Sequence, residues 1–376
     1  MAAKKLMLDL PLKLILTEDG ASNFISHKKN LKRIKLADNV EEYGVSLNKF
    51  SPQSIQNMLL LDYVSKIEIS MSEFVSKRQE VMDLSKLIVY SILYKQFDRE
   101  IFQAFISSDC VRKHNRQNPA QLIDEKTDMG EMKLRQILST KNGLIQQTRK
   151  AILAPIWKAI MSNKDYSPEE KNVYLLTSEK FMNRLGLLNW YIITKFSNDE
   201  NFSEMLSSIR SLLSRYMDKS KIAEYISVMV MELALNNENA NIRKEAQQMY
   251  SDRDDINVLV LDPDVRRKIV RELESKHEQV FLSWKIGGGS SAIGKQGRLH
   301  ITLYNKDDEF QEVKENIETK AQADTNKRSL VDFYRELPDG QEGTDLGMYY
   351  LSYLDDACKK VNVKSESLVN QFTASR

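Results

Sequence analysis

Glu232 and Asn236 are the residues of this chain whose types and spacing most directly indicate a polar site. They lie four residues apart in the segment Ile222 to Ala240, where apolar residues recur at helical spacing. Side chains four residues apart on a helix point the same way from successive turns. A carboxylate and an amide in a mostly apolar face cost free energy unless another group pairs with them. The pair therefore predicts a site with a partner group; the simpler alternative is a helix that turns polar at its C-terminal end.

The segments that would position this pair alternate between helix and strand. The apolar patterns and turn residues of the C-terminal third predict, in chain order, a helix at Pro263–Gln279, strands at Val280–Ile286 and Arg298–Tyr304, a charged segment at 306–342, a helix at Leu346–Lys360 and a strand at Val361–Val369. The two strands are joined by a glycine-rich connection, which is typical of a hairpin.

This order of elements, with E-L-A-L-N at Glu232 to Asn236 and G-T-D-L-G-M from Gly343, resembles the GHKL ATPase superfamily of gyrase, histidine kinases and anti-sigma serine kinases. The resemblance implies that Asn236 holds a magnesium ion and that Glu232 orients or deprotonates the attacking hydroxyl or water. It also implies that Gly343 and Gly347 belong to a turn that receives phosphate at a helix start, where free N–H groups favour an anion. Asn305 would accept a hydrogen bond from the adenine amino group.

The sequence also departs from the pattern of this superfamily. Asn305, Lys306 and Asp307 stand where the family has Asp-x-Gly, and Asp345 replaces a glycine in the phosphate turn. An asparagine carbonyl accepts without the charge assistance of a carboxylate, which makes such a bond about half as strong.

The resemblance and these departures together lead to two alternative functions. The first is a regulatory or adaptor protein on a degenerate histidine kinase-like fold, without a cofactor, that acts through protein–protein interaction. The alternative is an active serine kinase or ATPase that uses ATP and magnesium.

The expected fold class is α+β, with a mainly helical N-terminal region before a GHKL-type α/β sandwich containing a mixed sheet. The expected divisions are a small β-containing unit at 1–50, a helical domain at 51–198 and a GHKL ATPase-like domain at 199–376. In the first, alternating leucines from Leu6 to Leu16 predict either one strand at a sheet edge or two short strands, because Pro11 cannot donate a hydrogen bond. Thr17–Gly20 is predicted as a turn, and short strands are expected at 34–36 and 43–47.

The helical domain is expected to begin at Ser51–Pro52 and to be helical throughout 52–106. A helix pair follows, with Pro155 inside its first member and a capping box from Ser167 to Glu170 at the start of its second. Such a hairpin could be a dimerising stalk or simply part of a helical domain.

The bulk composition is that of a soluble protein with several domains. The chain has 376 residues, a formal net charge of +2 and 41% hydrophobic residues. This charge gives no reason to expect nucleic acid or a membrane surface as a partner. Two cysteines, Cys110 and Cys358, favour reduced thiols in the cytoplasm. The expected partners are proteins. Self-association is a further expectation, because the last strand pair of the fold is incomplete at Arg376 and would borrow a strand unless the chain is truncated.

Overall fold

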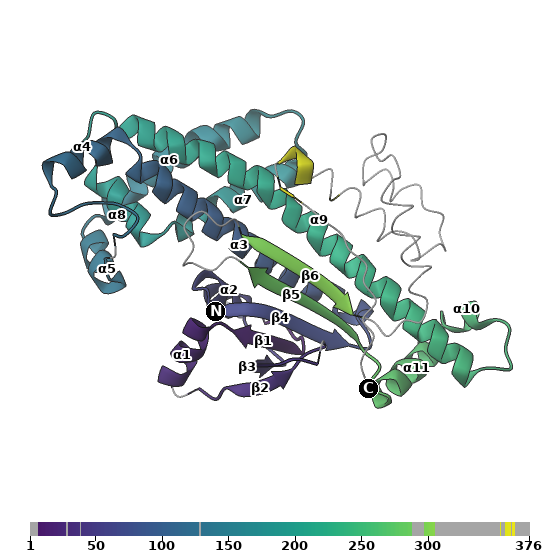
Figure 1. Cartoon of the computed structure of the whole chain (residues 1–376). Helices are drawn as coiled ribbons and strands as arrows, with labels where there is room; N and C mark the ends of the chain where they lie inside the picture. The colour runs from purple at the N-terminus through teal and green to yellow at the C-terminus, as the bar shows by residue number, and fades with distance from the viewer. Residues whose placement is uncertain are drawn as a thin grey trace, which may run out of the picture. The chain divides into compact units, whose positions relative to one another are not determined.

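The computed structural model describes residues 7–287 except 28, 38 and 128, residues 297–304, and residues 354, 358–361, 363 and 364. The helices are α1 (Glu18–Ser26), α2 (Pro52–Leu60), α3 (Arg78–Ile106), α4 (Asp109–Gln117), α5 (Glu131–Ser139), α6 (Asn142–Ser162), α7 (Pro168–Arg184), α8 (Leu187–Lys195), α9 (Phe202–Met249), α10 (Ile256–Leu259) and α11 (Pro263–Ser275) (Figure 1). The strands are β1 (Leu12–Leu16), β2 (Lys32–Lys35), β3 (Glu41–Leu47), β4 (Val64–Met71), β5 (Val280–Gly287) and β6 (Arg298–Tyr304), and a 3₁₀ turn at Val75–Lys77 precedes α3.

The chain divides into two compact units, and the boundaries fall inside α3 and α9. Unit 1 comprises residues 1–91 and 222–376, and unit 2 comprises residues 92–221. These limits differ from the three consecutive segments expected from the sequence. In the sequence, the helical unit is an insertion, because its residues lie between the two stretches that form the unit with the sheet. Helices α3 and α9 each begin in one unit and end in the other.

Unit 1 is built on a six-stranded sheet with the order β2-β3-β1-β4-β5-β6. Every pairing between these strands is antiparallel, so the expected mixed sheet is wrong for the part of the chain that the structure describes. The expectation that residues 1–50 form a separate unit is also wrong, because β1 pairs with β4 and β4 pairs with β5. The hairpin of β5 and β6 therefore completes a sheet that the N-terminal strands begin. The α+β class is correct.

The register separates the sheet into an apolar and a polar face. Two apolar rows cross four strands, Leu14–Ile67–Trp284–Ile301 and Leu12–Ile69–Leu282–Leu303. The members of these rows on β1, β4 and β5 are buried. The opposite face carries the row Lys13–Glu68–Ser283–Thr302. In this row the Lys13 ammonium lies 3.0 Å from the fully buried Glu68 carboxylate. Apolar and polar residues thus alternate along these strands, although Glu68 and Ser283 of the polar row are buried as well. Figure 1 shows α3 running behind the sheet.

Two expectations for the N-terminal segments are wrong. β1 is a central strand rather than an edge strand, since β3 and β4 flank it. The alternative of two short strands is closer, because Leu8 forms a bridge with Phe50 before Pro11 and β1 begins after it at Leu12. Thr17 does not form a turn with Gly20 but caps α1, because its side chain accepts the Gly20 N–H. A residue larger than glycine is excluded at position 20, where a Cβ atom would lie 2.2 Å from the Tyr63 carbonyl oxygen.

The segment 52–106 is not helical throughout, because β4 lies between α2 and α3. Helix α2 ends at Leu60, and Asp62 then adopts a left-handed conformation with φ of 58°. Left-handed backbone is favoured by glycine and less often by aspartate, so the sequence here contained no clear helix stop. The buried residues of β4 include Ile67, Glu68 and Ile69 in succession, which hides the alternation of a strand.

Other expectations are confirmed. Strands β2 and β3 lie near the positions predicted for them, and β5 and β6 pair as a hairpin. The N–H of Glu170 donates to the Ser167 hydroxyl, and the Glu170 carboxylate accepts the Ser167 N–H, so the capping box is present at the start of α7. Helix α11 begins at Pro263, and Asp262 caps it.

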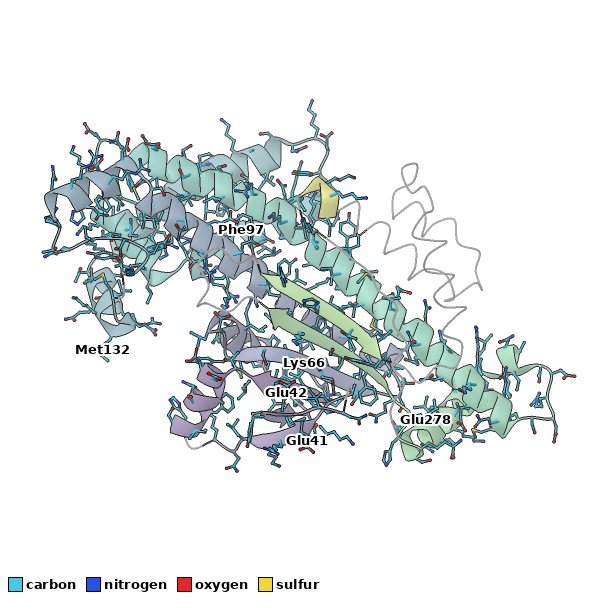
Figure 2. All side chains as sticks on the ribbon, viewed as in Figure 1. Glu41, Glu42, Lys66, Phe97, Met132 and Glu278 are labelled. Atoms are coloured by element: carbon cyan, nitrogen blue, oxygen red, sulfur yellow. The ribbon has the colours of Figure 1, made fainter. Side chains whose placement is uncertain are left out.

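Unit 2 has an aromatic core between its helices. Phe97 is fully buried, and its ring centroid lies 5.6 Å from that of Tyr216 (Figure 2). Phe181 of α7 packs on Tyr216 with centroids 4.5 Å apart. The side chain of Asp98 accepts hydrogen bonds from the Gly186 N–H at 2.8 Å and from the Asn189 amide at 3.0 Å, which ties the start of α8 to α3.

Candidate functional site

Glu232 is buried in unit 1 and is paired with an arginine. Its carboxylate oxygen lies 2.7 Å from Arg78 Nη2, and its side chain is 8% exposed. Burial raises the pKa of Glu232, while the positive charge of Arg78 lowers it. Arg78 is the first residue of α3, so this pair joins α3 to α9. The sequence pattern correctly indicated a carboxylate that needs a partner, and the partner is a side chain of the same protein.

Asn236 lies one turn further along α9. Its side-chain oxygen is buried and accepts no hydrogen bond from the residues that the structure describes. An unsatisfied buried amide oxygen costs roughly 1–3 kcal/mol. It is the one sign in the geometry of α9 that agrees with the magnesium role implied for Asn236. In the described ranges no three His, Cys, Asp or Glu side chains form a group that could hold a metal ion.

Glu238 is a buried carboxylate of α9 that the sequence analysis missed. Its Oε2 atom accepts the Phe74 N–H at 2.5 Å and the Val75 N–H at 3.2 Å, and its Oε1 atom accepts from Arg266 Nη2 at 2.5 Å. Burial raises the pKa of Glu238, and these three donors lower it. The polar stretch NNENANIRKE, which contains Glu238, is typical of the solvated end of a helix. Only the structure, through the contacts of Glu238 with the segment after β4 and with α11, shows that this side chain is buried.

Glu245 continues this row of carboxylates towards the end of α9. Its two oxygens lie 2.6 and 2.8 Å from Lys276 Nζ, and its side chain is 3% exposed. Near it, residues of α9, of α11 and of the end of α10 form an apolar cluster of Ile242, Ala246, Val260, Ile269, Val270 and Leu273. The three buried glutamates of α9 are therefore each bound to a cation from another segment of unit 1. The arrangement fastens α9 to α3, to the segment after β4 and to α11.

The positions of the other residues that the resemblance implies cannot be compared with those of the three buried glutamates. Asn305, Gly343 and Gly347 lie outside the described residues, as do Asp307, Asp345 and the charged segment 306–342. The predicted helix at 346–360 and the predicted strand at 361–369 are described only in part. The adenine contact and the phosphate turn therefore stay predictions.

A second candidate site lies in unit 2, on the hairpin of α6 and α7. From Ala151 to Met161 the sequence AILAPIWKAIM has one charged residue, Lys158. Ile152, Leu153, Ile156 and Ile160 are buried, so they account for only one face. A soluble helix that is apolar on all faces normally has all of them covered. Large apolar side chains are exposed on both helices of the hairpin: Trp157 (37%), Met161 (58%), Val173 (51%) and Leu176 (55%).

We call these four side chains the hairpin patch. Trp157 Nε1 donates to the Ser178 hydroxyl at 3.0 Å, which fixes the level of α6 against α7. Buried positions 174, 178 and 181 on α7 leave Val173 and Leu176 on its outer side, as helical spacing requires. The packing beneath these four side chains therefore holds them in place on the surface of the hairpin.

Pro155 lies inside α6 and has no N–H to donate to the Ala151 carbonyl. Arg210 Nη2 donates to this carbonyl oxygen at 3.0 Å. Arg210 belongs to α9 within unit 2, so a side chain from a neighbouring helix replaces the missing backbone hydrogen bond. This contact explains why α6 continues through Pro155.

Fold and candidate sites together define an α+β protein with an antiparallel sheet, a long helix whose buried glutamates are paired with cations, and a helical unit, inserted in the sequence, that has exposed apolar side chains. The chain belongs to the family described as "Family of unknown function (DUF8084)", which matches residues 3–376. It is 39% identical over 373 residues to a protein of Treponema pallidum (strain Nichols) described as an uncharacterized protein, covering 99% of this chain and 96% of that relative. No solved structure matches this chain. Among the described helices, none is both long and apolar enough to cross a bilayer.

Proposed function

We propose that this protein is a non-enzymatic regulatory or adaptor protein that acts through protein–protein contacts made by the hairpin patch. The observation that carries the proposal is the apolar stretch of α6, whose exposed Trp157 and Met161 leave apolar surface in water beside Val173 and Leu176 of α7. Trp and Met are enriched at protein interfaces, and a rigid apolar patch is the usual form of such a site. Buried cysteines at positions 110 and 358 fit a reducing cytoplasm as its location.

The charged row on α9 supports the non-enzymatic part of this proposal. A general base must reach the proton that it removes, and its carboxylate must be available to do so. Glu232 is held by Arg78 at 2.7 Å, and Glu238 is held by Arg266 at 2.5 Å and by two backbone N–H groups. Each carboxylate stabilises the packing of α9, which is a sufficient role for a buried glutamate. Under this proposal a histidine kinase-like origin of the sheet would be a scaffold without nucleotide.

The second candidate function is an ATP-dependent kinase or ATPase, and the observation that favours it is the unpartnered oxygen of Asn236. An amide oxygen is a suitable ligand for magnesium, which would supply charge neutralisation to the phosphates of ATP. The neighbouring groups fit such an ion poorly, because the Arg78 cation occupies Glu232, the carboxylate one turn away. We therefore place this function second.

Site-specific photo-crosslinking in the organism's own cells tests the proposed function. A photoreactive residue at position 157 should give crosslinked species, because the hairpin patch contacts a protein. The same residue at position 132 of α5, where Met132 is 86% exposed, is the matched control and should give less than a tenth of that yield. Equal yields at both positions, or none at position 157, would refute the hairpin patch as the interaction surface.

A further inference from the structure

We propose that the protein binding the hairpin patch is a second copy of this chain, with α6 of each copy packed on α7 of the other. The inference rests on the proposed function, because it identifies the partner for the same surface. It makes the helical unit the dimerising element of the protein.

The heights of the exposed apolar residues along the axis of the hairpin make the hairpin patch self-complementary. Trp157 is level with Ser178 of the same chain through the hydrogen bond between them. A two-fold axis parallel to the helices of the hairpin leaves the height of every residue along that axis unchanged. It places α6 of one copy opposite α7 of the second copy. Trp157 of one copy then lies within one turn of Leu176 of the second copy. Met161, one turn closer to the hairpin tip, lies beside Val173 of the second copy. Each exposed apolar side chain of α6 thus covers one of α7, as an isologous interface requires.

The charges of the two helices favour this pairing over α6 on α6. The charged residues of α6 are all basic: Arg149, Lys150 and Lys158. Helix α7 carries three glutamates and three basic residues, Glu169, Glu170, Glu179, Lys171, Lys180 and Arg184. Packing α6 against α6 would oppose only like charges, whereas packing α6 against α7 brings the basic helix to one that contains carboxylates. The charges therefore favour the arrangement in which the apolar residues also meet, although Glu179 already pairs with Arg149 of its own chain.

The first measurement is the molar mass of the full chain by light scattering across a range of concentrations. The unaltered protein should reach twice its chain mass of 43.5 kDa, and the double variant Trp157→Ser with Met161→Ser should give one chain mass at the same concentrations. The matched control is Met132→Ser, because Met132 is 86% exposed on α5 and points away from that helix (Figure 2). This control should remain dimeric. An unaltered protein that is monomeric throughout, or a dimer that survives both serine substitutions, overturns the inference.

Disulfide trapping distinguishes the two helix pairings. Equal amounts of Met161→Cys and Val173→Cys proteins are mixed and oxidised, so that a bond between the new thiols can form only between copies. Cys110 and Cys358 are buried and serve as a common background. The mixture should give a covalent dimer, and each variant alone should give less than a fifth of that yield. A higher yield from Met161→Cys alone would show α6 on α6 and overturn the proposed pairing. A monomer that nevertheless crosslinks to another protein from position 157 would refute the second copy and leave the proposed function standing.

Discussion

The carboxylate of Glu238 accepts the backbone N–H of Phe74 at 2.5 Å, a contact between residues 164 positions apart in the chain. The same oxygen accepts the Val75 N–H at 3.2 Å, and the other oxygen binds Arg266. Phe74 is fully buried at the turn between β4 and α3. Glu238 of α9 therefore holds both the turn that follows β4 and α11, the helix that precedes β5.

Replacing Glu238 by alanine should be strongly destabilising. The substitution leaves Phe74 N–H without its acceptor and removes the partner of Arg266, so we expect the free energy of unfolding to fall by about 3 kcal/mol. Urea denaturation followed by circular dichroism measures this change. The control is Glu224→Ala on the same helix: Glu224 is about half exposed and pairs with Lys86 at the surface, so its loss should cost less than about 1 kcal/mol. Equal costs for the two variants would show that Glu238 is not the fastening contact.

Magnesium-ATP should not stabilise the protein. A ligand that binds only the folded state at a hundredfold excess over its Kd adds about 2.7 kcal/mol, which is an easily measured rise in melting temperature. We expect no significant rise with millimolar magnesium-ATP, because Arg78 already neutralises Glu232. Differential scanning fluorimetry with and without the nucleotide measures the shift. A clear rise that is lost in Asn236→Ala would favour the ATP-dependent function instead.

The sequence predicted local elements better than their connections. The capping box at Ser167, the helix start at Pro263 and the hairpin of β5 and β6 follow from turn residues and periodicity, which act over a few residues. The pairing of β4 with β5 joins segments more than two hundred residues apart, as the register Ile67 to Trp284 shows. No local pattern encodes such a pairing, so the sheet was divided wrongly between two predicted domains.

The charged residues of α9 show a similar limit. Glu232 stood out because it interrupts an apolar stretch, and its burial confirms that part of the prediction. Glu238 and Glu245 lie in a polar stretch and are just as buried, because α11 and the turn after β4 cover them. The signal for these two residues lies in basic partners, Arg266 and Lys276, that follow about thirty residues later. Spacing along one helix could not reveal them.

Asp98 should give the stability of the protein a pH dependence. Burial raises the pKa of Asp98, although the Gly186 N–H and the Asn189 amide lower it in part. A carboxyl group with a raised folded-state pKa contributes stability below its ordinary pKa, and this stability is lost as the pH rises through the folded-state value. Asp98→Asn keeps an acceptor oxygen for Gly186 but cannot ionise. The free energy of unfolding of the variant should therefore match that of the unaltered protein near pH 4 and exceed it by a growing margin towards pH 7. Urea denaturation at each pH measures this difference.

Asp199 provides a control of opposite sign for this measurement. The Asn201 N–H, followed by the Cys110 thiol, lowers the pKa of Asp199. Its carboxylate contributes stability above the ordinary pKa, which is lost as the pH falls through the folded-state value. Asp199→Asn should therefore fall further behind the unaltered protein as the pH rises from 3 to 6. Parallel pH curves for the two variants would contradict the burial of Asp98 as the cause.

Pro155 and Arg210 should show coupled effects on stability, because Arg210 supplies to the Ala151 carbonyl the hydrogen bond that Pro155 cannot. Arg210→Met in the unaltered protein should lower the free energy of unfolding by about 1 kcal/mol more than it does in a Pro155→Ala background, where the new N–H can reach the carbonyl. A double-mutant cycle by urea denaturation measures this difference. Arg149→Met is the matched control, since Arg149 of α6 pairs with Glu179 and not with Ala151, and its cost should be the same in both backgrounds. If Arg210→Met costs as much with alanine at position 155 as with proline, Arg210 stabilises α6 by packing alone.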